Sequence, residues 1–203
     1  MTNQLLVLSD IHGQYDLLEE ALEPHYHHSY ELIVLGDMFD RAIPGGDSKV
    51  LSLLQRIQTN PSDFGFSKVT LLRGNHEDML IQSIEHGPLS SAFYHWVLNG
   101  GDPDFYIEAC AHLDWLKSLP FYYLKDDYLF VHAGVTPGVP LEDQRTTDLM
   151  WIRDDFLDVN DHELPYYVIH GHTPVDEVEV LPNRMNIDTG SFFSGKLSTV
   201  LLS

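Results

Sequence analysis

The sequence predicts an α/β fold in which two mixed β-sheets pack as a sandwich flanked by helices. Strand-like and helix-like segments alternate along the first third of the chain, which is the rhythm of βαβ units. The second half is different, because it contains several strand-like segments with few helical interruptions. An α/β half followed by a mostly β half favours two sheets packed face to face with helices outside.

In the first half, short apolar runs predict strands and amphipathic stretches predict helices. The expected strands cover residues 4–9, 31–35 and 68–72, and the expected helices cover 15–22, 49–58 and 77–86. Further helical pieces are expected over 90–97 and 103–118, with Cys110 as a buried helix residue.

In the second half, the pair Asp126-Asp127 separates two apolar runs. Asp favours turns, so residues 121–125 and 128–132 are expected to form a hairpin. The remaining expected strands cover residues 166–170, 177–181, 184–187 and 197–202.

Composition limits the classes of protein to which the chain can belong. Its 203 residues are most simply one domain, 1–203, large enough for a real core. A formal net charge of −20 argues against a nucleic-acid partner, and no apolar run is long enough for a membrane span. The acidity fits either a solvated surface or steering of basic substrates. The single cysteine, Cys110, excludes an internal disulfide and favours a reducing cytoplasm, while the oligomeric state stays open.

Five short segments are rich in side chains that bind metals, and the first four directly follow apolar runs. They are Ser9-Asp10-Ile11-His12-Gly13, Gly36-Asp37-Met38-Phe39-Asp40-Arg41, Gly74-Asn75-His76-Glu77, His132-Ala133-Gly134 and Gly171-His172-Thr173. Several strands ending at one place would bring such segments together. Hard oxygen ligands mixed with imidazoles, without a thiolate, suit a hydrolytic centre with divalent metals.

Several residues of these segments also have a simpler explanation than metal or phosphate binding. Asp10 and His12 lie two residues apart, so extended backbone would aim both side chains at one ion, but Asp10 could equally cap a helix. The two oxygens of Asp37 can bridge cations roughly 3.5–4 Å apart. Asn75 offers a neutral oxygen ligand or a helix cap. Arg41 offers either a planar fork of donors for phosphate or a surface salt bridge.

Taken together, the motifs resemble the metallophosphoesterase superfamily, and specifically its phosphoprotein phosphatase branch. That branch carries GDxHG, GDxxDRG, GNHE, HGG or HAG, and a last His. The closest in size are the small bacterial and lambda-phage-type serine/threonine phosphatases. The resemblance implies the calcineurin-like fold. Two departures stand out: Ser9 replaces the first Gly of GDxHG, and Ala42 replaces the Gly of DRG, which removes freedom for positive φ.

The resemblance also implies a role for each matching residue. Six side chains would hold two divalent ions: Asp10 and His12 the first, Asp37 both as a bridge, and Asn75, His132 and His172 the second. The family points to Mn²⁺, whereas the ligand types also permit Fe or Zn. His76 would be the general acid, oriented by Asp40, and Arg41 would clamp the phosphate. A second phosphate-binding arginine would be Arg153, with Arg73 as the alternative.

The activity implied is hydrolysis of phosphoesters by a hydroxide that bridges two metal ions. The expected substrates are phosphoserine and phosphothreonine in proteins or peptides, with phosphotyrosine and small phosphoesters as further candidates. One alternative is a symmetrical diadenosine tetraphosphate hydrolase or another nucleotide phosphohydrolase. A second is a non-catalytic binding module. The intact pairs Asp40-Arg41 and His76-Glu77 favour the phosphatase, and the complete ligand set together with His76 disfavours the silent module.

Several residues outside the ligand set keep two interpretations. His170 and Asp188 could support ligand side chains or serve only local structure. His25, His27 and His28 are expected in a solvated loop. Phe192, Phe193 and the tryptophans belong either to the core or to a rim that faces the substrate.

Overall fold

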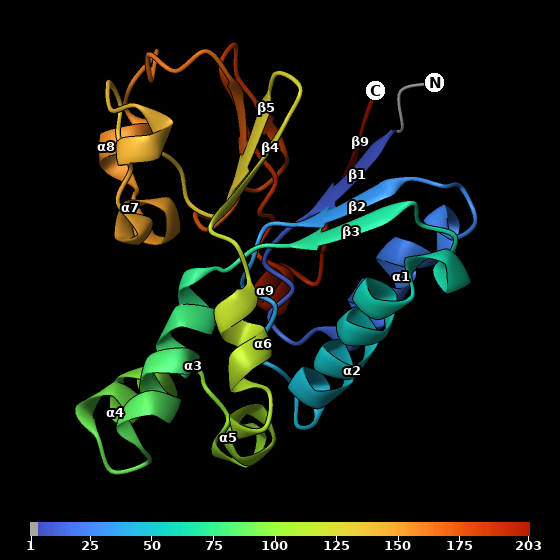
Figure 1. The fold of residues 1–203 in the computed structure, drawn as a ribbon, viewed down its shortest axis with the longest axis vertical. Helices are drawn as coiled ribbons and strands as arrows, with labels where there is room; N and C mark the ends of the chain where they lie inside the picture. The colour runs from blue at the N-terminus through green and yellow to red at the C-terminus, as the bar shows by residue number, and fades with distance from the viewer. Residues whose placement is uncertain (1–3) are drawn as a thin grey trace.

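The computed structural model describes residues 4–203, and its first sheet contains the strands nearest the N-terminus of the chain (Figure 1). The strand order is β3-β2-β1-β9. The bounds are β1 Leu5–Leu8, β2 Glu31–Val34, β3 Lys68–Leu71 and β9 Thr199–Leu202. β1, β2 and β3 are parallel, and β9 is antiparallel to β1, so the sheet is mixed.

The second sheet contains five strands in the order β4-β5-β6-β8-β7. The bounds are β4 Tyr122–Lys125, β5 Tyr128–Val131, β6 Tyr167–His170, β7 Glu179–Val180 and β8 Arg184–Asn186. β5, β6 and β8 are parallel, whereas β4 and β7 are antiparallel edge strands. The expected hairpin is therefore β4–β5, and the predicted class of two mixed sheets is confirmed.

Alternation of side chains along the strands explains how the two sheets pack. Leu5 and Val7 of β1 lie in one buried cluster with Phe130 of β5 and Ile169 of β6, so this cluster joins the two sheets. The residue between them, Leu6, lies in a different cluster with residues of the helices. Successive residues of a strand point to opposite faces, so the inner strands are apolar on both sides.

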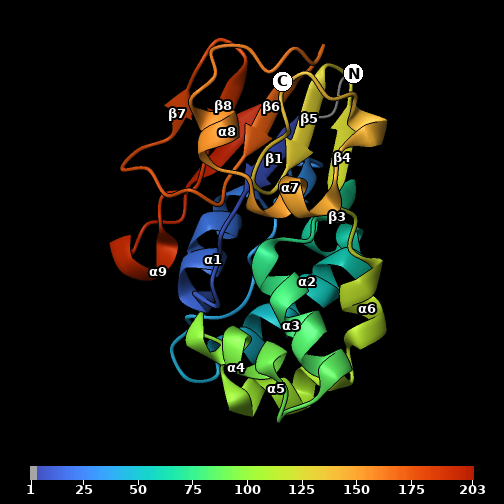
Figure 2. The ribbon, with the colours of Figure 1, turned by 90° about the vertical axis from the view of Figure 1, so that its left-hand side faces the viewer.

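Six helices cover the outer side of the first sheet and extend away from it (Figures 1 and 2). The bounds are α1 Tyr15–Leu22, α2 Gly46–Thr59, α3 Asn75–His86, α4 Ser91–Leu98, α5 Pro103–Cys110 and α6 Leu113–Ser118. Single turns of 3₁₀ helix cover Glu23–His25, Pro61–Phe64 and Leu141–Asp143. The predicted helices of the first half are confirmed, with α2 and α3 starting earlier than expected.

Two short helices cover the outer face of the second sheet: α7, Thr146–Trp151, and α8, Asp154–Leu157. Leu149 of α7 and Phe156 of α8 lie in one buried cluster with Leu129 and Val168 of the sheet. A third short helix, α9, covers Ser191–Ser194. Among residues 4–203, none of the helices combines the length and the apolar character needed to span a bilayer.

The helical pieces expected over 103–118 are α5 and α6, separated by a turn that places His112 beside Gln55 of α2 (Nδ1 to Nε2, 3.0 Å). Two other expectations were wrong in detail. The strand expected over 177–181 is only two residues long. Cys110 is exposed, because the buried side of α5 is formed by other residues: Phe105, Tyr106 and Ala109.

Candidate metal centre

The six expected metal ligands follow the carboxyl ends of five strands, and these strands belong to both sheets. Asp10 and His12 come after β1, Asp37 after β2, Asn75 after β3, His132 after β5 and His172 after β6. All six are buried. Four of them have left-handed backbone: φ is 51° at Asp10, 49° at His12, 49° at Asp37 and 70° at His172. Such backbone strain in residues other than glycine persists where the surrounding structure enforces it, and it is concentrated at functional sites.

The carboxylate of Asp37 lies at the centre of this arrangement. It belongs to two groups of ligand atoms within 4.8 Å of one another, one with His12 and His76 and the other with His132 and His172. Oδ2 lies 3.8 Å from Nε2 of His12, whereas Oδ1 lies 3.4 Å from Nε2 of His132. The two oxygens thus face different histidines, as a carboxylate that bridges two ions requires.

The histidine rings are held so that nitrogen lone pairs face inward. Nδ1 of His132 lies 3.0 Å from the carbonyl oxygen of Leu35, so this nitrogen must carry the proton and donate it. Nε2 of His132 then presents a lone pair, and its neighbours are Oδ1 of Asn75 at 2.9 Å and Nδ1 of His172 at 3.2 Å. These three atoms converge with too few protons to make a hydrogen bond at every contact, so a cation between them would be stabilising. His12 is oriented in the same way, with Nδ1 3.1 Å from the carbonyl oxygen of Phe39.

Burial disfavours the charged forms of the acids and histidines in the cluster, and a bound metal would offset this effect for the carboxylates. It raises the pKa of Asp37 well above the usual value, and the nearby Asp10 carboxylate raises it further. Burial also lowers the pKa of His12 and His132, so both imidazoles are neutral and able to bind a cation. Buried carboxylates facing neutral imidazoles and an amide oxygen fit a pair of divalent cations.

Asp10 lies beside these two groups rather than within them. Its Oδ2 accepts hydrogen bonds from the hydroxyl of Ser9 and from the backbone N–H of His172, the latter at 3.2 Å. Gly171 permits this approach, since a Cβ there would lie 2.2 Å from the same oxygen. The position of Ser9, which departs from the family pattern, therefore supplies a hydrogen bond to Asp10.

His76 and Asp40 form a buried pair next to Asp37. Nδ1 of His76 lies 2.7 Å from Oδ2 of Asp40, which leaves Nε2 facing Asp37 at 3.9 Å. The indole N–H of Trp96 donates to both oxygens of Asp40, at 2.8 and 2.9 Å. Burial raises the pKa of Asp40 to about 8, and burial together with the Arg41 guanidinium lowers the pKa of His76 to about 3. Both groups are therefore uncharged at neutral pH.

Two residues of this site, Trp96 and Glu77, have structural roles that were not predicted from the sequence. The Glu77 carboxylate accepts from the backbone N–H groups of Asp37 at 2.9 Å, Met38 at 2.8 Å and Gly74 at 2.8 Å. It thereby ties the loop after β2 to the loop after β3. The place of Glu77 in the GNHE motif was a partial signal, whereas Trp96 lies 56 residues from its partner and has no motif of its own.

Asp47 is a further buried acid, located in the first turn of α2. Its Oδ1 accepts from the backbone N–H of Asp40 at 2.9 Å, and its Oδ2 has no hydrogen-bond partner in the described part of the chain. Burial, with the Asp40 carboxyl next, raises the pKa of Asp47 to about 8. Asp47 is thus a protonated acid, and its hydrogen bond holds the backbone at the start of the Asp40–Arg41 segment.

Of the three expected phosphate-binding arginines, two border the site. The Nη1 of Arg41 lies 3.2 Å from Nε2 of His12, and φ at Arg41 is 60°. Ala42, by contrast, does not adopt a positive φ, so the loss of Gly at that position leaves the loop unstrained there. Arg153 donates to Oγ1 of Thr173 at 2.7 Å, next to His172.

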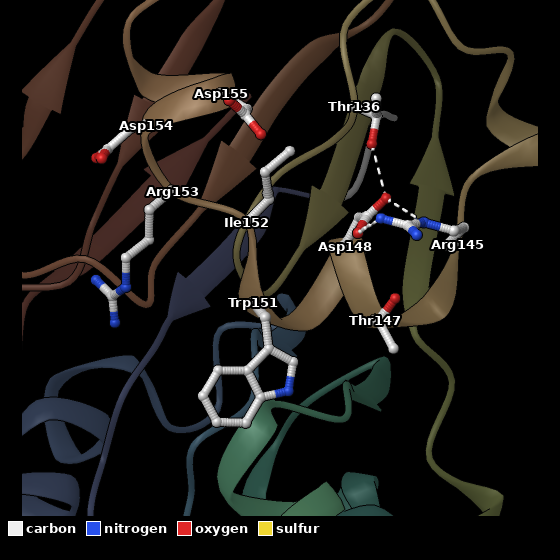
Figure 3. Close-up of a pocket in the computed structure, with 9 residues that line it drawn as sticks. All are labelled: Thr136, Arg145, Thr147, Asp148, Trp151, Ile152, Arg153, Asp154 and Asp155. Atoms are coloured by element: carbon white, nitrogen blue, oxygen red, sulfur yellow. Dashed lines mark hydrogen bonds and ion pairs between the residues drawn. The ribbon is translucent and has the colours of Figure 1, made fainter.

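Arg153 lines a cavity of about 590 Å³ beside α7 and α8 (Figure 3). On the other side of that cavity, Arg145 pairs with Asp148, with Nη2 2.7 Å from Oδ1. Trp151 extends from the same segment, and its ring centroid lies 6.0 Å from that of His172. Arg153 and Trp151 therefore approach the centre from the side of the second sheet.

Arg73 lies outside this arrangement, contrary to its expected place as an alternative phosphate ligand. Its Nη2 donates to the carbonyl oxygen of Lys117 at 2.6 Å, and its guanidinium stacks on Phe121 at 4.6 Å. These contacts direct the side chain toward α6.

The two residues with open interpretations differ in their surroundings. Asp188 follows β8 and accepts from the backbone N–H of Gly190 at 2.8 Å. Burial raises the pKa of Asp10, and the Asp188 charge is the next cause of that rise, so Asp188 lies close to the ligands. Nδ1 of His170 lies 3.2 Å from the carbonyl oxygen of Gly171, and its ring packs edge-on against Phe156 at 5.1 Å. Its Nε2 has no hydrogen-bond partner among residues 4–203. Within the described part of the chain, His170 thus makes packing contacts and no hydrogen bond to a candidate ligand side chain.

Comparison with known proteins adds a family model and several relatives. The model described as calcineurin-like phosphoesterase matches residues 4–196. Serine/threonine-protein phosphatase 2 of Escherichia coli is 29% identical over 95% of this chain and 89% of its own length. The bis(5'-nucleosyl)-tetraphosphatase PrpE (asymmetrical) of Anoxybacillus flavithermus is 24% identical over 96% of this chain and 88% of its own length. The solved structure of a putative diadenosine tetraphosphatase shares the fold, with a TM-score of 0.72 and 18% identity over 99% of this chain and 90% of that one.

Proposed function

Because the chain belongs to the calcineurin-like phosphoesterase family, whose members hydrolyse phosphoesters with divalent metals, we propose that it is a serine/threonine protein phosphatase. The observation that carries this proposal is the pair Asp40–Arg41. Asp40 contacts His76, and Arg41 borders His12, so an acid and a phosphate clamp flank one cluster. The similarity to a bacterial serine/threonine phosphatase supports the same substrate class.

The six ligands would hold two ions, with Mn²⁺ as the metal we propose. Asp10, His12 and Asp37 would serve the first, and Asp37, Asn75, His132 and His172 the second. When bound, the ions lower the pKa of water and offset the charge of the phosphate oxygens. Arg41 and Arg153 would hold the phosphate by donating to its remaining oxygens.

His76 would give a proton to the leaving oxygen of the serine or threonine. With a proton on Asp40, the carboxyl donates to Nδ1, and the imidazole carries its own proton on Nε2, on the side of Asp37. The Nε2 proton passes to the leaving oxygen as the P–O bond breaks, and Nδ1 takes the proton of Asp40. An alkoxide is a poor leaving group, so this transfer matters more for phosphoserine than for a phenolic ester.

The nucleotide-hydrolase alternative has one specific observation in its favour, the tetraphosphatase relative at 24% identity. The charge of this chain supports the phosphatase instead. Asp154 and Asp155 line the cavity next to Arg153, and the net charge is −20, so a tetraphosphate would meet repulsion. The silent-module alternative conflicts with the complete set of buried ligands.

A substrate comparison tests the proposal directly. Protein stripped with EDTA and reloaded with Mn²⁺ is given a phosphothreonine peptide and diadenosine tetraphosphate in parallel, and product release is measured. Turnover of the peptide supports the phosphatase. Turnover of the dinucleotide alone would assign the chain to nucleotide hydrolysis, and silence on both substrates with metal bound would refute the proposed function.

The variant His76→Asn tests the acid. We expect it to slow hydrolysis of phosphoserine far more than hydrolysis of p-nitrophenyl phosphate, whose leaving group needs no proton. Equal losses on the two substrates would contradict the role of His76. The metal content of the variant, measured alongside, separates a lost acid from a lost ion.

A further inference from the structure

The side chain of Arg41 is enclosed by three segments that are distant in sequence. Its Nη1 lies 3.2 Å from Nε2 of His12, its Nε donates to the carbonyl oxygen of Asn99 at 3.3 Å, and its guanidinium lies 4.7 Å from the ring centre of Phe192. The backbone N–H of Arg41 also donates to the carbonyl oxygen of Gly100 at 2.8 Å. Arg41 is thus fixed from three sides, and the contribution of Phe192 has no counterpart in the motifs.

The turn between α4 and α5 is shaped for this arginine. A Cβ at Gly100 would lie 2.6 Å from Cγ of Arg41, and φ at Gly100 is 104°, a conformation that favours glycine. The turn therefore packs against one side of the Arg41 side chain at van der Waals distance.

Phe192 closes another side because α9 is fastened to the loop that carries Asp10 and His12. The hydroxyl of Ser191 donates to the backbone carbonyl oxygens of Asp10 and Ile11, the latter at 3.0 Å. The next residue, Phe192, then packs edge-on against the His12 ring, with centroids 5.1 Å apart. Its position relative to Arg41 thus follows from hydrogen bonds of the preceding residue.

A role in the buried core does not explain why a phenylalanine occupies position 192. The ring is 38% exposed and belongs to none of the three buried clusters of the fold. Its contacts are instead with a candidate metal ligand and a candidate phosphate clamp. The neighbouring Phe193 is 64% exposed and contacts Phe192 at 5.0 Å, but has no recorded contact with Arg41.

We propose that Phe192 is a positioning residue that holds the Arg41 guanidinium in the orientation that binds phosphate. This role rests on the proposed contact of Arg41 with the substrate. The ring face stabilises the cation, and with Nε bound to Asn99 the guanidinium keeps Nη2 without a hydrogen-bond partner among residues 4–203. Nη2 and Nη1 can then donate to an oxyanion as a fork, since a metal ion would take the lone pair of His12 Nε2.

Binding of inorganic phosphate to the Mn²⁺-loaded protein tests this role without depending on turnover. Phe192→Leu keeps apolar volume and removes the ring, so we expect calorimetry to show a Kd about three- to tenfold higher, the size of a partly exposed cation–π contact. Phe192→Tyr should bind as the unaltered protein does. Phe193→Leu is the matched control, and should also leave Kd unchanged.

A double-mutant cycle with Arg41→Ala separates positioning from a general structural effect. If Phe192 acts through Arg41, adding Phe192→Leu to Arg41→Ala should change Kd less than twofold. In the phosphopeptide assay, Phe192→Leu should raise KM more than it lowers kcat.

Three results would overturn the proposal: an unchanged Kd in Phe192→Leu, an effect that persists without the arginine, or no phosphate binding by the unaltered protein. Phosphate binding with the expected pattern but no hydrolysis of any phosphoester would instead leave the positioning role standing and remove the proposed function.

Discussion

Asp47→Asn should make the protein more stable at neutral pH, although it alters a buried hydrogen-bonded residue. The asparagine keeps the oxygen that accepts from the backbone N–H of Asp40, and it replaces only the oxygen without a partner. What it removes is a carboxyl group that the folded protein must keep protonated, since burial raises the pKa of Asp47 to about 8.

The magnitude follows from the difference in proton affinity between the two states. In the unfolded chain an aspartate has a pKa near 3.9, so between about pH 4 and pH 8 the unfolded state loses its proton while the folded state keeps it. Below about pH 4 the aspartate therefore has no cost in unfolding free energy. Above that, up to about pH 8, the protein loses about 1.4 kcal/mol of unfolding free energy for each pH unit. At pH 7 the difference is about 4 kcal/mol in favour of Asp47→Asn.

Urea denaturation of the metal-free protein at a series of pH values measures this effect. The difference in unfolding free energy between Asp47→Asn and the unaltered protein should be small at pH 4 and should increase up to about pH 8. Asp16→Asn is the matched control, because Asp16 is an exposed acid in the first turn of α1, as Asp47 is in the first turn of α2. A variant no more stable than the unaltered protein at pH 8 would refute the reasoning.

Three further substitutions address the centre itself. Asp37→Ala should lower the bound metal from two ions to fewer than one, since its carboxylate faces both ligand groups; retention of two ions by elemental analysis would contradict this. Trp96→Phe removes the indole donor to Asp40 and should lower kcat for phosphoserine about tenfold with little change in KM, as expected for a hydrogen bond worth about 1.5 kcal/mol. Gly171→Ala places a Cβ 2.2 Å from Oδ2 of Asp10 and should weaken metal binding, which titration calorimetry would show.

The two-sheet fold was predictable because the inner strands are apolar on both faces. Runs such as Leu32-Ile33-Val34 allow few other structures, and the motifs that follow them mark where the strands end. The short helices α7, α8 and α9 were not predicted. They have four to six residues each, too few for a helical period to be recognised in the sequence.

The expected ligands could be identified as a group because each lies in a motif with its own spacing. Their supporting residues could not, since support depends on contacts across the fold. Trp96 reaches Asp40 from α4, and Phe192 reaches Arg41 from α9, with no local pattern in either segment. The same reason explains Arg73, whose neighbours Lys117 and Phe121 lie more than forty residues later in the sequence.

The division of the ligands between two sheets has a mechanical consequence. Asp37 and Asn75 belong to the first sheet, whereas His132 and His172 belong to the second, so an ion held by all four would act as a cross-link between the halves of the sandwich. At a metal concentration one hundred times Kd, that cross-link would add about 2.7 kcal/mol to the free energy of unfolding. Metal supply would then set the stability of the folded chain as well as its chemistry, in addition to the apolar cluster that already joins the two sheets.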